Sequence, residues 1–452
     1  MSHVPMTLPE LMISQQAHPF SHTSSYVRLD DGRIFHGSYG ASTTSSDNGM
    51  TWADTRLMRD TNGKQLYSQT IVRLAGKNAI GSIGEQRLRQ ELCWKPTWPT
   101  PYAQMKRSCQ VLFWRSDDGG ETWQLPVPVT PHGVHFQTLV DTAIRTSSGR
   151  IVVPVYSHLG QKTTGPQDQP LLMSGKLVRN QWLGTAGHFF DPGFCTVVVC
   201  YSDDEGQTWQ RNDDGDLFIL PEYSVYHSLY EPTVTEVKPG RLLMMMRTGL
   251  GRLFQAWSND NGTTWTRAQP TSLAASHAPA QLRTLPNGHL LCVWTQETEE
   301  EVKAGYVRTR LSSAISRDGG RVWEFFQNVE SIHETTRVEP GPIHPTKPVE
   351  VYTPAGRAAL ERDAAYIFDH PEYPRFSYPS VFIDGDQVLI AYTYTNPVDH
   401  PTEAKMVNHF ADGKEGTVNY QRLKILPLKW FYGGKQPADN PFLKEAYLPA
   451  KP

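Results

Sequence analysis

The sequence predicts an all-β fold, a six-bladed β-propeller built from four-stranded antiparallel blades. Three observations lead to this prediction. Short apolar runs are separated by 34 Pro and 35 Gly residues, helical periodicity is scarce over the 452 residues, and one polar motif recurs along the chain. Internal repeats override the length prior of about three domains. We therefore expect a single propeller domain over residues 1–452.

The recurring motif has the pattern S-x-D-x-G-x-[TV]-W. Its copies begin at Ser45, Ser116, Ser202, Ser258 and Ser316. The Asp can accept backbone N–H bonds inside a tight turn, the Gly can adopt positive φ, and the Trp can pack back over the sheet. The serines lie 71, 86, 56 and 58 residues apart, which leaves room for several short strands in each repeat.

One complete repeat runs from Tyr230 to Trp265. Two apolar strands flank the turn at Pro239-Gly240, and a third strand leads into the polar motif. Glu231 stands at the start of the first strand and Arg247 at the end of the second. This repeat is the pattern with which the other blades are located.

The innermost strand of each propeller blade runs along the central channel, so the residue at its start faces one mouth of that channel. A mouth lined by polar and titratable groups favours a functional site. The blades are expected to begin near residues 22, 69, 141, 231, 277 and 378, which places six polar side chains on one ring: His22, Gln69, Asp141, Glu231, His277 and Tyr378.

Three insertions interrupt the repeats, near residues 86–110, 160–190 and 329–375. Loops of this length in a compact domain are usually covers of a site or flexible decorations. Trp94 and Trp98 in the first insertion could stack on a sugar ring or pack on the blade surface.

Composition excludes several classes of partner. The net charge of -3 and a pI near 6.6 provide no basic footprint for nucleic acid. No run of about 18 apolar residues and no signal pattern is present, so no membrane is expected, and the location is cytoplasmic unless a leader was removed. Five scattered cysteines argue against a disulfide framework and a zinc site, and Cys195 and Cys200 read as buried thiols. No metal and no cofactor are expected.

The five-fold motif is the Asp-box, and its recurrence resembles the BNR-repeat propellers of the sialidase (neuraminidase) superfamily. The resemblance implies an exo-α-sialidase with a tyrosine nucleophile, a glutamate base, an aspartic acid as general acid, and three arginines that bind the substrate carboxylate. The segment from Glu231 to Arg247 resembles the family's glutamate-to-second-arginine segment. Arg308, eight residues before Ser316, resembles the third arginine, and Tyr378 resembles the nucleophile.

Two departures from the family pattern concern the first arginine and the acid. His22 stands where the first arginine is expected, which resembles a broader sialidase-like branch; it could donate a hydrogen bond, transfer a proton or bind carboxylate when protonated. The segment from Arg33 to Ser42, where the family carries its acid, has no carboxylate. Replacements at the mouth are Asp141, Glu85 and His22. Asp141 is favoured because the repeat sets its position.

The predicted tyrosine, glutamate and arginines have complementary chemical roles. A phenol with a pKa of about 10 needs a base to act as a nucleophile at neutral pH, and Glu231 can provide it for Tyr378. A neutral nucleophile also suits an anionic substrate. Arg247 and Arg308 can bind a carboxylate bidentately, although salt bridges to acids such as Glu231 are an alternative. Further substrate contacts are expected from Gln69, His277 and Glu85.

The sequence therefore predicts a glycoside hydrolase that removes a terminal acidic sugar, sialic acid or a related 2-keto sugar acid, from an acidic glycan or oligosaccharide. Two alternatives stay open. One is a glycosidase or lyase that acts on a uronic-acid polysaccharide, and the other is a non-catalytic glycan-binding propeller. The oligomeric state is not predicted.

Overall fold

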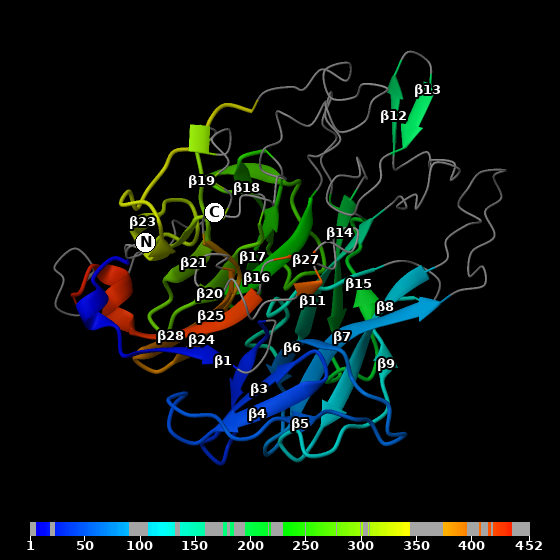
Figure 1. Cartoon of the computed structure of the whole chain (residues 1–452). Helices are drawn as coiled ribbons and strands as arrows, with labels where there is room; N and C mark the ends of the chain where they lie inside the picture. Colours follow the sequence, from blue (N-terminus) through cyan, green and yellow to red (C-terminus); the bar gives the residue numbers. More distant parts are fainter. Residues whose placement is uncertain are drawn as a thin grey trace.

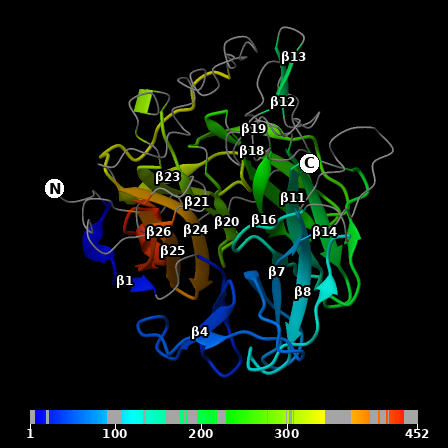
Figure 2. The ribbon, with the colours of Figure 1, turned by 45° about the vertical axis from the view of Figure 1, so that its right-hand side comes forward.

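In the described part of the chain, strands form six four-stranded antiparallel sheets, which confirms the predicted propeller (Figure 1). Figure 2 shows that consecutive blades follow one another round a ring. The computed structural model describes residues 6–18, 23–89, 107–131, 136–158, 175–178, 181–184, 195–215, 217, 229–248, 250–276, 278–298, 300–301, 306, 308–343, 374–395, 406–407, 415–416 and 419–435.

Blades one to three follow the predicted order, each starting with its inner strand. Blade one contains β2 (Tyr26–Arg28), β3 (Ile34–Ser38), β4 (Ala41–Ser45) and β5 (Arg56–Leu57). Blade two contains β6 (Ser68–Arg73), β7 (Ile80–Arg89), β8 (Arg107–Ser116) and β9 (Val127–Pro128). Blade three contains β10 (Ile144–Arg145), β11 (Ile151–His158), β14 (Cys195–Ser202) and β15 (Gln210–Arg211).

Blades four and five repeat this order, and blade six departs from it. Blade four contains β16 (Tyr230–Lys238), β17 (Arg241–Arg247), β18 (Arg252–Ser258) and β19 (Gln269–Ala274). Blade five contains β20 (Gln281–Thr284), β21 (Leu290–Thr295), β22 (Arg310–Ser316) and β23 (Glu324–Ser331). Blade six contains β24 (Arg375–Asp384), β25 (Gln387–Thr395), β28 (Asn419–Pro427) and, at its outer edge, β1 (Ser14–His18).

The chain closes its ring through β1, which sequence analysis did not foresee. This strand pairs antiparallel with β28, from Ser14 opposite Ile425 to His18 opposite Gln421. The N-terminal strand thus completes the last blade, while β2 begins the first. Such a latch joins the two ends of the propeller by a ladder of backbone hydrogen bonds.

The Asp-box turns have the predicted chemistry, seen clearly at the end of β18. Asp260 accepts the Thr264 N–H at 2.9 Å and its hydroxyl at 2.6 Å. Ser258 Oγ accepts the Gly262 N–H at 2.8 Å, and Gly262 has a φ of 92°. Trp265 Nε1 donates to the Gly262 carbonyl at 3.0 Å. These turns follow the third strand of a blade, so they lie at the end opposite to the start of the inner strand and cannot line that mouth.

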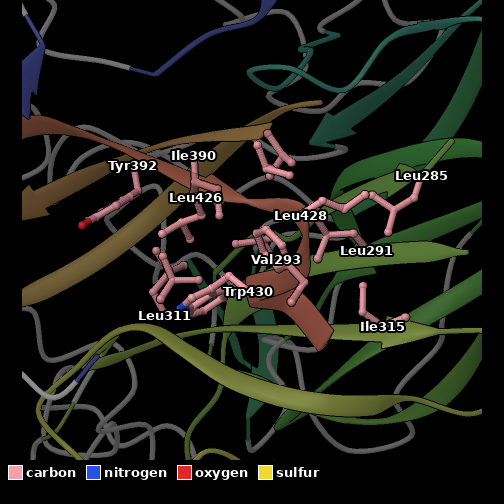
Figure 3. Packing of buried hydrophobic residues seen from close by; sticks show 14 of the residues in the cluster. Leu285, Leu291, Val293, Leu311, Ile315, Ile390, Tyr392, Leu426, Leu428 and Trp430 are labelled. Carbon is pink, nitrogen blue, oxygen red and sulfur yellow. The ribbon is translucent and has the colours of Figure 1, made fainter. Parts of the chain in front are cut away.

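Apolar side chains fill the spaces between neighbouring blades. Figure 3 shows the contact between blades five and six, where Val293 of β21 and Ile390 of β25 pack around Trp430. Trp430 belongs to a short 3-10 helix, η5 (Leu428–Tyr432), and another, η1 (Pro9–Leu11), lies near the N-terminus. Each fully buried side chain of this size contributes about 1.5–3 kcal/mol.

Strand ends reach into two of the predicted insertions. β7 continues to Arg89, β8 begins at Arg107 and β23 continues to Ser331, so the insertions predicted near 86–110 and from 329 include strand ends. Backbone hydrogen bonds extend these ladders beyond the apolar runs from which the strands were predicted. The insertion near 160–190 carries a hairpin that stands apart from the blades (Figure 1). Its strands are β12 (Gly175–Val178) and β13 (Gln181–Gly184), and a further pair is β26 (Met406–Val407) with β27 (Glu415–Gly416).

Among the described side chains, the thiols of Cys109, Cys200 and Cys292 are buried. Burial raises the pKa of Cys200 to about 12, so the buried-thiol interpretation is confirmed for this residue. The Cys195 side chain lies outside the described residues. No helix in the described ranges is long and apolar enough to cross a membrane.

Candidate active site

Bulges at the start of three inner strands turn polar side chains out of the ladder. In β6 the extra residue is Gln69, since the register shifts between its two neighbours. The same shift occurs between Tyr230 and Thr233 in β16, around Glu231, and in β24 around Tyr378. β-bulges re-aim side chains and are common next to active sites. The first strands of blades one and two, two and three, four and five, five and six, and six and one contact one another around the channel.

The backbone at the site adopts a conformation that costs energy. Glu231 has a φ of 47°, Tyr378 of 52°, and Asp141 and Arg308 each of 58°. A non-glycine residue in this left-handed region costs about 1–3 kcal/mol, and such residues cluster at functional sites. In addition, Pro follows Glu231 and Tyr378 directly, and the residue before Pro normally prefers extended backbone.

Tyr378, Glu231 and Arg247 form one hydrogen-bonded group. The Tyr378 hydroxyl donates to Glu231 Oε1 at 3.1 Å, and Arg247 Nη1 donates to the same hydroxyl at 3.3 Å. Arg247 also forms a salt bridge with Glu231 Oε2. The residues are 0% (Arg247) and 5% (Glu231) exposed. The salt bridge between Arg247 and Glu231, which the sequence left open as an alternative, therefore exists. It joins the predicted base to an arginine predicted to bind the substrate carboxylate.

Arg308 completes this group from blade five. Its guanidinium carbon lies 5.5 Å from the centre of the Tyr378 ring, while that of Arg247 lies 4.5 Å from the centre of the Tyr230 ring. Burial lowers the pKa of Arg308, with Tyr378 acting in the opposite direction and Arg247 adding to the decrease. Two guanidiniums thus accompany one carboxylate, Glu231, and this part of the mouth suits an anion.

The environment holds the proton on Tyr378. Burial raises the pKa of its phenol, and the charge of Glu231 adds to this increase, while Arg247 and Arg308 oppose it. The resting phenol is therefore neutral near pH 7. It needs a base in hydrogen-bond contact to become a nucleophile, and Glu231 is in such contact.

Asp141 lies at the predicted position, but its side chain serves other contacts. Its Oδ2 accepts hydrogen bonds from the Ser380 hydroxyl at 2.8 Å and the Val381 N–H at 2.9 Å, and pairs with Arg283 at 2.5 Å. These contacts join blades three, five and six across the channel. An oxygen that already accepts from three donors is poorly placed to protonate a leaving group, so the contacts favour a structural role over the predicted acid role.

Glu85 lies buried on β7 beside the bulge of β6. Its Oε1 accepts the Thr138 N–H at 3.1 Å. The preceding Gly84 allows close approach of the two strands, because a Cβ there would lie 1.9 Å from the Tyr67 carbonyl oxygen. Glu85 lies within electrostatic range of Tyr39 and Tyr156.

Four tyrosines that sequence analysis missed surround the group: Tyr39, Tyr67, Tyr156 and Tyr230. The rings of Tyr39 and Tyr67 meet edge to face at 4.5 Å, and those of Tyr156 and Tyr230 lie 6.3 Å apart. Burial raises the pKa of Tyr156, and the charges of Glu231 and Glu85 add to the increase. The adjacency of Tyr230 to Glu231 was a usable signal, whereas Tyr156 lies in an apolar run without one.

Four predicted residues, His22, His277, Trp94 and Trp98, lie outside the described residues. Within the ranges that the structure describes, no cluster of three or more His, Cys, Asp or Glu side chains is arranged to hold a metal ion.

The repeated blades, the Asp-box turns and the mouth define a sialidase-like BNR propeller. The chain belongs to the BNR repeat-like domain family, whose profile matches residues 96–390, more than half of its length. No curated protein matches the chain.

Solved structures resemble the chain at low sequence identity. A protein of unknown function from Dyadobacter fermentans DSM 18053 is 18% identical with a TM-score of 0.51, over 92% of this chain and 98% of that one. The Hadza microbial sialidase Hz136 is 15% identical with a TM-score of 0.48, over 93% and 67%. Trypanosoma rangeli sialidase, solved with the inhibitor DANA, is 14% identical with a TM-score of 0.48, over 89% of this chain. The present chain spans 54% of the length of that sialidase.

Proposed function

We propose that this protein is a glycoside hydrolase of the exo-α-sialidase type, which removes a terminal acidic sugar from a glycan. The observation that carries the proposal is the Tyr378 hydroxyl, held between Glu231 and Arg247 at 3.1 and 3.3 Å beside Arg308. The substrate class follows from the charges, since two guanidiniums beside a neutral nucleophile suit a sugar carboxylate.

The contacts define a sequence of steps. Arg308 and Arg247 bind the sugar carboxylate and place the anomeric carbon near Tyr378. The Tyr378 oxygen attacks this carbon and passes its proton to Glu231, while the bond to the leaving oxygen breaks. Water then attacks the glycosyl-tyrosine: its hydroxyl joins the sugar, its remaining proton balances the one that the leaving oxygen takes up, and the proton on Glu231 returns to the Tyr378 oxygen. Two displacements at one carbon retain its configuration.

The first prediction concerns Tyr378→Phe, measured by release of the aryl group from sialyl aryl glycosides. Because the phenyl ring cannot form the covalent intermediate, we expect kcat/KM to fall by roughly 10²–10⁴-fold. Tyr201→Phe is the matched control, since its hydroxyl contacts Gln210 on the outer strand of blade three and should leave activity unchanged. Absence of turnover by the unmodified protein across sialic acid and related 2-keto acid glycosides would contradict the proposal.

The tyrosines around the group favour one alternative chemistry. Tyr39 on blade one and Tyr156 on blade three provide further phenols within electrostatic range of Tyr378, and phenols can abstract or donate protons in an elimination. A lyase acting on a uronic-acid polysaccharide would release an unsaturated product that absorbs ultraviolet light. Hydrolysis releases none, so the absorbance of the product distinguishes the two reactions. A non-catalytic propeller would bind glycan without either product.

A further inference from the structure

A second group of titratable side chains lies on blades one and two. Its centre is Tyr39, which lies in the turn between β3 and β4. The Tyr39 N–H donates to the Ser68 carbonyl at 2.9 Å, and its ring meets the Tyr67 ring at 4.5 Å. The Tyr39 hydroxyl shares a hydrogen bond with the Gln69 side chain. The phenol is thus tied to the bulge that begins blade two.

The turn retains Tyr39 at an energetic cost. Its φ is 53°, in the left-handed region where glycine is preferred, and the cost for another residue is about 1–3 kcal/mol. Glu231 and Tyr378 share this conformation. Ser38 and Gly40 on either side are buried, whereas Tyr39 is only half-buried. Stability alone therefore does not explain a tyrosine here.

The phenol of Tyr39 lies within electrostatic range of the proposed nucleophile. Burial raises its pKa, the charges of Tyr67, Glu85 and Tyr378 add to the increase, and the hydrogen bond from Gln69 opposes it. Tyr39 thus holds its proton throughout the neutral range. Blade one has no carboxylate between Arg33 and Ser42. The phenol of Tyr39 is a group in that segment that can deliver a proton.

We propose that Tyr39 is the residue that protonates the leaving oxygen, with the charge of the nearby Glu85 acting on it. This inference rests on the proposed hydrolase function. As the bond between the anomeric carbon and the leaving oxygen breaks, the Tyr39 O–H proton moves to that oxygen, and the alcohol departs neutral. The water that hydrolyses the glycosyl-tyrosine returns one proton to the Tyr39 phenolate and its oxygen to the sugar. The sum is hydrolysis, and both tyrosines are restored.

A phenol of raised pKa is a weak acid, so its help depends on the leaving group. A sugar alkoxide is basic enough to take the proton, whereas a strongly acidic phenol leaves without help. The proposal therefore predicts a dependence on leaving-group basicity that a residue with a merely structural role would not produce.

The second prediction uses aryl glycosides of the acidic sugar with leaving phenols of graded pKa. For Tyr39→Phe we expect kcat/KM to fall steeply as the leaving phenol becomes less acidic, by roughly 10²–10⁴-fold for an alcohol leaving group. The most activated substrate should be cleaved at nearly the rate of the unmodified protein. Tyr201→Phe, the control, should keep the shallow dependence of the unmodified protein.

Two further variants keep the test decisive if Tyr39→Phe fails to fold. Incorporation of 3,5-difluorotyrosine at position 39 preserves the shape and lowers the phenol pKa, so the alkaline limb of the pH profile should move to lower pH. Glu85→Gln should move it in the same direction, because a negative charge is removed. Equal leaving-group slopes with and without the Tyr39 hydroxyl, in an active protein, would overturn the role of Tyr39 alone. An unmodified protein that cleaves no member of the series would overturn the hydrolase function and this inference together.

Discussion

Arg247 is the residue on which the electrostatics of the mouth depend. It is 0% exposed, pairs with Glu231 and contacts the Tyr378 hydroxyl. Burial acts to lower its pKa, but the charge of Glu231 outweighs this and raises it. A buried pair of this kind stabilises little relative to apolar packing, whereas the loss of one partner leaves an uncompensated charge.

The third prediction follows from that asymmetry. Arg247→Met should lower the free energy of unfolding by about 3–5 kcal/mol, because Glu231 then stays buried without its cation. Arg56→Met is the matched control, since Arg56 is 71% exposed and pairs with Glu121 on the surface, and it should cost less than about 1 kcal/mol. Urea unfolding measures both. Equal losses in the two variants would show that the pair in the mouth is no more consequential than a surface pair.

The sequence predicts residues of this site where a motif carries them. Glu231, Arg247, Arg308 and Tyr378 were placed by the repeat and the resemblance, and the structure brings them together. Asp141 shows what the sequence cannot predict. The repeat locates the start of the strand at this residue but not the direction in which the Asp141 carboxylate points. Their catalytic roles remain predictions that the experiments above test.

At the scale of the element, the bulge that begins β6 depends on a glycine in the neighbouring strand. Ser68 pairs with Gly84, and Thr70 with Ile83, the residue before it in β7, so Gln69 is left outside the ladder. A Cβ at Gly84 would lie 1.9 Å from the Tyr67 carbonyl oxygen. The clash is with backbone, which cannot rotate away as a flexible side chain can.

The fourth prediction is that Gly84→Ala lowers both stability and activity. Separation of the two strands should cost about 1–3 kcal/mol, as overpacking of a core typically does, and should displace Gln69 and Glu85 from the mouth. Ile83→Val, one residue earlier in β7, is the control; it should cost about 0.5–1.5 kcal/mol and leave kcat/KM unchanged. Chemical denaturation and the aryl glycoside assay provide the two readouts. Unchanged stability in Gly84→Ala would contradict the close approach of β6 and β7.

At the scale of the whole molecule, the number of blades was predictable and the closure was not. Five Asp-box copies and the Tyr378 segment carry the periodicity from which six blades follow. β1 has no apolar alternation, and its partner β28 lies about 400 residues away in the chain, so no local pattern could link them. Long-range pairing of this kind is set by the complete fold.

The contact between β1 of blade six and β3 of blade one, which we call the seam, contains two buried histidines, His18 on β1 and His36 on β3. Their ring centres lie 4.5 Å apart, Tyr26 stacks on His36 at 4.1 Å, and Trp52 lies 5.1 Å from His18. Burial lowers the pKa of His18 to about 3. Burial also lowers the pKa of His36, and His18 adds to the decrease, while the Ser25 carbonyl opposes it. Both rings are therefore neutral in the folded propeller at neutral pH.

The fifth prediction is that acid weakens the propeller through this seam. Unfolded histidines take up protons below a pKa of about 6.5, whereas the folded rings do not, so stability falls as the pH drops from about 6.5 toward the folded pKa of His18. Each histidine contributes a slope of about 1.4 kcal/mol per pH unit in that window. His18→Phe keeps an aromatic ring in the cluster and should remove one such contribution. The free energy of unfolding measured between pH 4.5 and 7 tests this. If His18→Phe retains the slope of the unmodified protein, proton uptake at the seam is not what limits the stability of the ring in acid.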